Sequence, residues 1–262
     1  MPSIRYPQRI VCLAAEAPEI LHRLGAFDRI VGVSGFARRP EAVKGLPKVG
    51  GFAQPDVERV LALRPDLVIT ISDIQAEAAA ALIKQGVPVL ALNPHRLEDV
   101  WRNILVIGGA IGAQRQAELL VASLQAELAA IPLLQPLPRR PRVFFEEWPD
   151  PLVSGIGWVG DLVRAVGGED LFPELADQPK AEGRVVTPEA VAAREPEVVL
   201  ASWCGKPADL EAIRRRPAWQ RTPAVRGGHI YEISSDLVLQ TGPSLIEGAR
   251  LIYQKLLEAT TC

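Results

Sequence analysis

The sequence of 262 residues has few aromatic residues, few cysteines and no surplus of either charge. Lysine and arginine number 29 against 31 aspartate and glutamate, spread along the chain, so no basic face is offered to nucleic acid. The three cysteines, Cys12, Cys204 and Cys262, are scattered without CxxC spacing. This pattern predicts free thiols and excludes a disulfide scaffold.

Long apolar runs are also missing. No stretch of about 18 uncharged apolar residues occurs, because Arg102, Arg115 and Glu118 flank the most hydrophobic segment, 104–113. We therefore expect no membrane insertion. The N-terminus passes directly into a strand pattern, without the apolar core or cleavage site of a signal peptide. As written, the chain predicts either a periplasmic protein from which a signal peptide was removed or a cytoplasmic relative.

Common catalytic motifs are absent as well. The sequence contains no GxSxG elbow, P-loop or HExxH motif, and His22, His95 and His229 are not paired at metal-ligand spacing. A GxGxxG pattern, which is typical of dinucleotide binding, does occur at Gly155, Gly157 and Gly160. Only the short apolar run 152–154 precedes it, and a bulky tryptophan lies inside it. We expect a protein that is not an enzyme, with a nucleotide-using Rossmann-like enzyme as the alternative.

What the sequence does contain is an internal echo. Residues 58–69 (ERVLALRPDLVI) and 189–200 (EAVAAREPEVVL) match at five of twelve positions across a displacement of 131 residues. Each copy predicts a helix, a proline-acid turn and a buried strand. Two copies half a chain apart indicate two similarly built lobes, and the cleft between two lobes is a common place for ligands.

Apolar runs alternate with helical patterns along both halves, which predicts an α/β fold with two Rossmann-like lobes around mostly parallel sheets. The segment 114–131 contains neither glycine nor proline and predicts one long rigid helix of about 27 Å joining the lobes. Proline-rich residues 132–141 follow it. The predicted division is an N-terminal lobe at 1–97, linking helices and the proline-rich segment at 98–140, and a C-terminal lobe at 141–262.

Ligands of open α/β sheets bind beyond the carboxyl ends of the strands. In this chain those ends gather aromatic side chains, although aromatics make up only 5% of the residues. Tryptophans in such loops suit a broad organic ligand, but each could equally pack a core, as we expect for Trp101 and Trp219. The candidate ligand-binding residues are Phe36, Phe52, Trp148, Trp158, Trp203, Ser235 and Asp236.

Acidic residues begin the helix that follows each copy of the echo. Glu77 stands after the first copy, and Asp209 and Glu211 after the second. Favourable interaction with the helix dipole explains acids at these places. The alternative is that one acidic side chain per lobe docks on a symmetric partner.

Three runs of the first half resemble the class III substrate-binding proteins of ABC importers, which take up vitamin B12, siderophores and haem. They are RIVCLAAEAPEILHRLGAFDRIVGVSGF, VGGFAQPDVERVLALRPDLVI and LIKQGVPVLAL. In the second half, FFEEWPDPLVSGIGWVGDLVRAVGGEDLF and RVVTPEAVAAREPEVVLASWCGK look like the second lobe of the cobalamin-binding branch. The likeness covers nearly the entire chain, and the EEW, PDPL and SWCGK segments are its most specific parts.

The resemblance implies a monomeric, non-enzymatic protein without a catalytic cofactor or a metal. It would grip cobalamin or a related corrinoid between its lobes and deliver it to the permease dimer of an ABC transporter. It implies ligand contacts from Phe52, from Trp203 and from Asp236, which follows Ser235. Glu77 falls on the first-lobe glutamate with which relatives engage transporter arginines, and Glu211 is the candidate in the second lobe.

Ligand identity stays open at this point. Ile71 stands where some relatives carry a tryptophan, which departs from the pattern of the corrinoid binders. A ferric siderophore or haem is the alternative ligand within the same fold. An anionic siderophore would need basic side chains near the ligand, and Arg38 and Arg39 beside Phe36 are the available pair.

Overall fold

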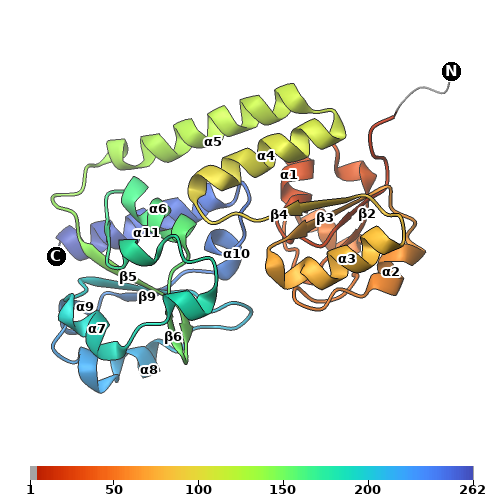
Figure 1. Ribbon diagram of the computed structural model, residues 1–262. Coiled ribbons are helices and arrows are strands. Elements are labelled where there is room, and N and C mark those ends of the chain that lie inside the picture. Colours follow the sequence, from red (N-terminus) through yellow and green to blue (C-terminus); the bar gives the residue numbers. More distant parts are fainter. Residues whose placement is uncertain (1–4, 262) are drawn as a thin grey trace. The chain divides into compact units, whose positions relative to one another are not determined.

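The computed structural model describes residues 5–261 (Figure 1), so the predicted free thiol at Cys262 lies outside the described residues. The chain forms two compact units. Unit 1 contains the described residues up to Pro94, with Asp99–Ser123 and Thr241–Pro243. Unit 2 contains His95–Glu98, Leu124–Gln240 and the described residues from Ser244 onward. The division at 97 and 140 drawn from the sequence stays a prediction.

Unit 1 is built on a parallel sheet of four strands in the order β2-β1-β3-β4. The strands are β1 (Ile10–Cys12), β2 (Ile30–Val33), β3 (Leu67–Ile71) and β4 (Val89–Leu92). Helix α1 (Ala17–Arg23) lies on one side of the sheet, and α2 (Val57–Ala62) and α3 (Ala76–Lys84) lie together on the other (Figure 1). This arrangement confirms the predicted parallel sheet, and all five residues of β3 are buried.

Unit 2 has a second sheet in the order β6-β5-β8-β9, with β7 paired to the first residues of β5. Its strands are β5 (Arg142–Pro149), β6 (Leu152–Ser154), β7 (Glu169–Asp170), β8 (Val198–Ala201) and β9 (Ile230–Glu232). The pairing is parallel except for β5 with β6, which is antiparallel. The helices are α6 (Gly157–Ala165), α7 (Pro188–Ala193), α8 (Leu210–Arg214), α9 (Pro223–Gly227), α10 (Ser235–Val238) and α11 (Leu245–Thr261).

Two long helices run from one unit into the other. Helix α4 (Leu97–Ile111) begins in unit 2 and continues in unit 1, and α5 (Gln114–Leu134) begins in unit 1 and ends in unit 2. The predicted end of α5 at Ile131 was too early, because Pro132 is accommodated inside its last turn. By length and composition α5 could cross a membrane, but one such helix is weak evidence, since core helices of other proteins pass the same test.

The internal echo corresponds to α2 with β3 in unit 1 and α7 with β8 in unit 2. The residue before each proline, Arg64 or Glu195, has a φ of 49° and so ends its helix in the left-handed conformation. The acid after each proline then accepts hydrogen bonds at the start of the unit's first strand. Asp66 accepts from the Arg9 amide at 2.8 Å, and Glu197 accepts from the Arg142 amide at 2.9 Å.

The arginine of each pair completes the motif. Arg9 Nε donates to the Arg64 carbonyl at 3.1 Å, and Arg142 Nε donates to the Glu195 carbonyl at 2.9 Å. We call this arrangement the arginine–acid clasp. Each clasp joins the beginnings of two neighbouring parallel strands, β1 with β3 and β5 with β8. The repeat seen in the sequence is therefore a repeat of strand pairing.

Candidate functional site

In unit 1 the connections run in opposite directions from the β1–β3 pair, because β2 lies on one side of it and β4 on the other. The carboxyl ends of such a pair form the crevice where ligands of doubly wound sheets bind. In unit 2 the β5–β8 pair has the corresponding place, with β7 beside β5 and β9 beside β8. The candidate ligand-binding residues are therefore expected at these two sheet edges.

Phe36 and Phe52 lie near one another in unit 1. Phe52 is at the tip of a tight loop closed by a bridge between Gly50 and Pro55. Phe36 packs toward this loop, because a β-carbon at Gly51 would lie 3.9 Å from Phe36 Cε2. Phe36 is exposed and Phe52 is half-buried, so the structure brings two partly accessible rings to one edge of unit 1.

Gln75 fixes this edge of unit 1, and it was not among the residues selected from the sequence. Its side chain is buried and lies at the carboxyl ends of β1 and β3. Gln75 Oε1 accepts from the Ile71 amide at 3.0 Å, and Nε2 donates to the Leu13 carbonyl at 3.2 Å and the Phe52 carbonyl at 2.9 Å. One amide thus ties the ends of two strands to the Phe52 loop. The feature of the sequence that could have identified Gln75 is a polar residue in the turn between a buried strand and a helix.

A buried carboxylate occupies the equivalent place in unit 2. Glu146, near the end of β5, has no exposed surface and accepts from Arg216 Nη2 at 2.8 Å, with Arg216 Nη1 donating to its other oxygen. Trp203 Nε1 donates to Glu146 Oε1 at 3.1 Å. The Arg216 guanidinium lies 4.4 Å from the ring centroid of Trp219. Trp203 is therefore fixed by a buried ion pair that joins β5, β8 and the residues after α8.

The next residue along β5, Glu147, forms a second ion pair. Arg184, almost fully buried, donates from Nη1 to Glu147 Oε2 at 2.6 Å and from Nη2 to Oε1 at 2.9 Å. Glu147 also accepts from the Ile156 amide at 3.0 Å. Because hydrogen-bonded pairing compensates the desolvation of both charges, the EEW segment presents neither carboxylate to a ligand.

The two remaining sequence candidates among the tryptophans differ in accessibility. Trp148 is half-buried at the end of β5, and its Nε1 donates to the Asp150 carbonyl at 3.1 Å. Trp158 is buried in α6, and its Nε1 donates to the Val238 carbonyl at 2.8 Å. Trp158 therefore ties α6 to α10. The expected core positions of Trp101 and Trp219 are confirmed, since both are buried.

The GxGxxG segment has a packing role in the structure. The strand before it, β6, is antiparallel to β5, whereas the dinucleotide motif follows a parallel strand. A β-carbon at Gly157 would lie 2.4 Å from the Ala176 carbonyl oxygen, and one at Gly160 would lie 2.4 Å from Asp170 Oδ2. The glycines are needed because neighbouring backbone and side chains approach closely, and this accounts for the pattern without a nucleotide.

Ser235 and Asp236 form the first turn of α10, directly after β9, and both are half-buried. The sequence reasoning placed them at a strand end but did not predict this short helix. The Ser234 hydroxyl donates to Asp236 Oδ1, and the Ser244 hydroxyl donates to the Asp236 carbonyl at 3.4 Å. These contacts fix the turn that carries the candidate aspartate.

The two docking candidates are both exposed but differ in their surroundings. Glu77, in the first turn of α3, has no side-chain partner among residues 5–261. Glu211, in the first turn of α8, pairs with Arg214 at 2.5 Å and Arg215 at 3.8 Å. The negative charge of Glu211 is therefore partly balanced by its own helix.

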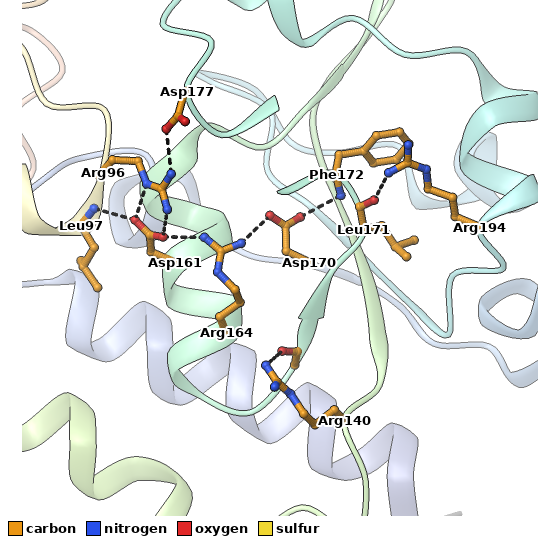
Figure 2. Close-up of polar contacts among 11 residues, drawn as sticks. Arg96, Leu97, Arg140, Asp161, Arg164, Asp170, Leu171, Phe172, Asp177 and Arg194 are labelled. Carbon is orange, nitrogen blue, oxygen red and sulfur yellow. Dashed lines mark hydrogen bonds and ion pairs between the residues drawn. The ribbon is translucent and has the colours of Figure 1, made fainter. Parts of the chain in front are cut away.

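A charged network fixes the beginning of α4 within unit 2 (Figure 2). Arg96 donates to Asp161 from Nε at 3.0 Å and Nη2 at 2.7 Å, and the Leu97 amide donates to Asp161 at 2.9 Å. Arg164 bridges Asp161 and Asp170. Burial by itself would raise the pKa of Asp161, but the hydrogen bonds from Arg96, Leu97 and Arg164 outweigh it and hold the pKa below its usual range.

Unit 1 contains a buried acid whose pKa is shifted in the opposite direction from that of Asp161. Glu16, in the loop after β1, is 4% exposed and accepts from the Thr241 hydroxyl at 2.8 Å. Burial raises its pKa above the usual range. Burial and the nearby Glu16 also raise the pKa of the Cys12 thiol. Among residues 5–261 no group of histidine, cysteine, aspartate and glutamate side chains is arranged to hold a metal ion.

Two units with mostly parallel sheets, each with aromatic side chains near its topological switch point, have the arrangement in which α/β proteins commonly bind small molecules. Comparison with known proteins makes the class specific. Residues 10–237 match the family model described as periplasmic binding protein. The chain therefore belongs to the periplasmic binding protein family, as a class III substrate-binding protein of the ABC importers.

Individual relatives agree with this assignment. The chain is 30% identical to an uncharacterized ABC transporter substrate-binding lipoprotein, YvrC, of Bacillus subtilis, over 95% of this chain and 80% of the relative. It is 28% identical to a vitamin B12-binding protein of Vibrio parahaemolyticus, over 90% and 84% of the two chains. Among solved structures, the apo periplasmic heme-binding protein RhuT of Roseiflexus superposes with a TM-score of 0.83, at 26% identity over 97% and 99% of the chains.

Proposed function

We propose that this protein binds cobalamin or a related corrinoid without chemically changing it and delivers it to an ABC importer. The observation that carries the proposal is the similarity to vitamin B12-binding proteins over most of both chains. The EEW and SWCGK segments, the most specific parts of that resemblance, form the sheet edge of unit 2 that holds Trp148 and Trp203. Flat indole faces at a strand edge suit a large, partly apolar ring system.

In this proposal, the candidate ligand contacts of each unit lie at its own sheet edge. Unit 1 supplies Phe36 and Phe52, whose loop is held by Gln75. Unit 2 supplies Trp148, Trp203, Ser235 and Asp236. Trp158 supports the site indirectly, because its indole N–H donates to a carbonyl at the end of α10. The rings give apolar area, and Asp236 gives a hydrogen-bond acceptor for a corrin side-chain amide.

Titration with cyanocobalamin tests the proposal. Saturable quenching of tryptophan fluorescence is expected, because four of the five tryptophans lie in unit 2. Trp148→Leu should weaken binding, whereas Trp101→Leu, in unit 1, serves as a control for loss of a tryptophan. The absence of saturable quenching by cyanocobalamin up to high micromolar concentration would refute the corrinoid ligand.

Haem is the second candidate ligand. It is favoured by the 26% identity and TM-score of 0.83 to the heme-binding protein of Roseiflexus. Competition between cyanocobalamin and haemin separates the two ligands. If haemin displaces cyanocobalamin and binds more tightly, the haem alternative replaces the corrinoid.

We further propose an extracytoplasmic, monomeric protein that docks on a permease dimer through Glu77 and Glu211. Support comes from the exposure of both carboxylates, one in each unit. Glu77 has no competing arginine, so Glu77→Arg should impair transporter binding more than Glu211→Arg. Reconstituted binding to the cognate transporter, with Glu58→Arg as an exposed control, measures the difference. Equal binding by Glu77→Arg and the wild type would contradict the docking role.

A further inference from the structure

The carboxyl edge of the unit 2 sheet carries a layered cluster of one lysine and two tryptophans. Trp148 lies at the end of β5, and Trp203 and Lys206 follow the neighbouring strand β8. Lys206 Nζ is 4.2 Å from the ring centroid of Trp148 and 5.0 Å from that of Trp203. Both distances are within the range of cation–π attraction, so the two indoles hold the ammonium group at this edge.

Neither indole has a free donor, and the two differ in accessibility: Trp148 is half-buried, whereas Trp203 is 8% exposed and belongs to the hydrophobic core of unit 2. Trp148 Nε1 already donates to the Asp150 carbonyl, and Trp203 Nε1 already donates to Glu146. An indole has one N–H donor and no acceptor. A ligand at this edge would therefore meet the half-buried ring of Trp148 and would find its polar partner in Lys206, which the buried ring of Trp203 also contacts.

Lys206 also lacks a counter-charge. Its side chain is exposed, and no carboxylate among residues 5–261 lies within ion-pairing distance of it. The acids of the surrounding elements are already engaged: Glu146 with Arg216, Glu147 with Arg184, Asp209 with the Ala212 amide, and Glu232 with the Ala208 amide. The edge therefore combines a half-buried indole with an exposed lysine that makes no ion pair among the described residues.

We propose that Lys206 is a specificity residue that pairs with an anionic group of the ligand while Trp148 contacts the ring system of the same molecule. This inference rests on the proposed binding function and narrows its substrate class to flat macrocycles that carry an anionic substituent. A corrinoid phosphodiester and a haem propionate share this chemistry. Both accept charge-assisted hydrogen bonds from an ammonium group.

The test compares ligands with and without the anion. Cyanocobalamin carries a phosphodiester, and dicyanocobinamide lacks it. Lys206→Gln should weaken cyanocobalamin binding about 10-fold or more, as expected for loss of a hydrogen bond between charged groups. Its affinity for dicyanocobinamide should change by less than about 2-fold, because no anion is present to lose its partner. Haemin, which carries two propionates, is the third ligand in this comparison.

Two further variants make the result interpretable. Lys206→Arg keeps the charge and should retain most of the cyanocobalamin affinity. Lys84→Gln removes an exposed lysine from the end of α3 and is the matched control for a loss of charge. Melting curves of Lys206→Arg and Lys84→Gln should match the wild type, and that of Lys206→Gln should shift only slightly, because the exposed Lys206 loses only its contacts with the two indole rings.

Each outcome decides a separate question. Equal loss of affinity for cyanocobalamin and dicyanocobinamide in Lys206→Gln, or no loss for either, overturns the assignment of Lys206 and leaves the corrinoid function standing. If the wild type binds only haemin, the corrinoid function fails, and weaker haemin binding by Lys206→Gln still supports the role of Lys206. A wild type that binds none of the three ligands overturns both proposals.

Discussion

Breaking the buried ion pair between Glu146 and Arg216 should strongly destabilise unit 2, and Arg216→Ala tests this. The substitution leaves a carboxylate with no exposed surface and with Trp203 Nε1 as its remaining side-chain donor among the described residues. Removing one partner of a buried pair costs about 3–5 kcal/mol. Loss of the guanidinium over the Trp219 ring adds about 0.5–1 kcal/mol. We expect Arg216→Ala to lose about 4 kcal/mol of unfolding free energy, which corresponds to about 8–16 °C in Tm.

Urea denaturation followed by tryptophan fluorescence measures this loss, because Trp148, Trp158, Trp203 and Trp219 all report on unit 2. The double variant Glu146→Gln with Arg216→Met removes both charges and keeps an acceptor for Trp203. It should recover at least half of the loss, because no uncompensated charge remains.

Arg214→Ala is the matched control. Its pair with Glu211 is exposed, so the change should cost no more than about 1 kcal/mol. The reasoning would be refuted if Arg216→Ala stayed within about 1 kcal/mol of the wild type, or if the double variant were no more stable than the single one.

Three further predictions follow from the buried polar groups. Glu16→Gln should stabilise the protein at pH 7–8, because the raised pKa of Glu16 means that its ionisation opposes folding as the pH rises; the gain in urea midpoint should vanish at about pH 3, where the acid is protonated in both states. Gln75→Leu should cost about 1–3 kcal/mol for the unpaired Ile71 amide and speed hydrogen exchange in residues 50–55, whereas unchanged exchange there would contradict its role. Asp161→Asn should reduce stability at pH 7 and flatten its decline below about pH 4, since the lowered pKa of Asp161 gives stability that is lost on acidification; parallel wild-type and variant profiles would exclude this.

The sequence predicted the elements whose apolar patterns are continuous and clearly bounded. Strand β3 was predicted from the first copy of the echo, because Pro65 lies in the turn before it and the run LVITI is buried throughout. Helix α10 was not predicted, because a single turn of four residues has no periodicity to detect. Strand β7 was not predicted for the same reason, because it has only two residues.

The site was less predictable than the fold. Strand-end aromatics such as Trp148 could be selected from the sequence, because parallel strands bring their carboxyl ends to one edge. The groups that fix them could not. Glu146 and Arg216 are 70 residues apart, and their pairing depends on the tertiary fold. Gln75 joins residues up to 62 positions away, and a lone glutamine carries no pattern.

The arginine–acid clasp gives the chain a local code for long-range strand pairing. Arg9 reaches Asp66 across 57 residues, and Arg142 reaches Glu197 across 55, so the two spacings are nearly equal. An arginine before one strand and a proline-acid pair before another thus identify which strands are neighbours and in which register. Each half carries its own copy of this code, so the alignment of one sheet does not rely on side chains from the other half. The clasp is therefore the feature to retain when such a half is moved into another α/β scaffold.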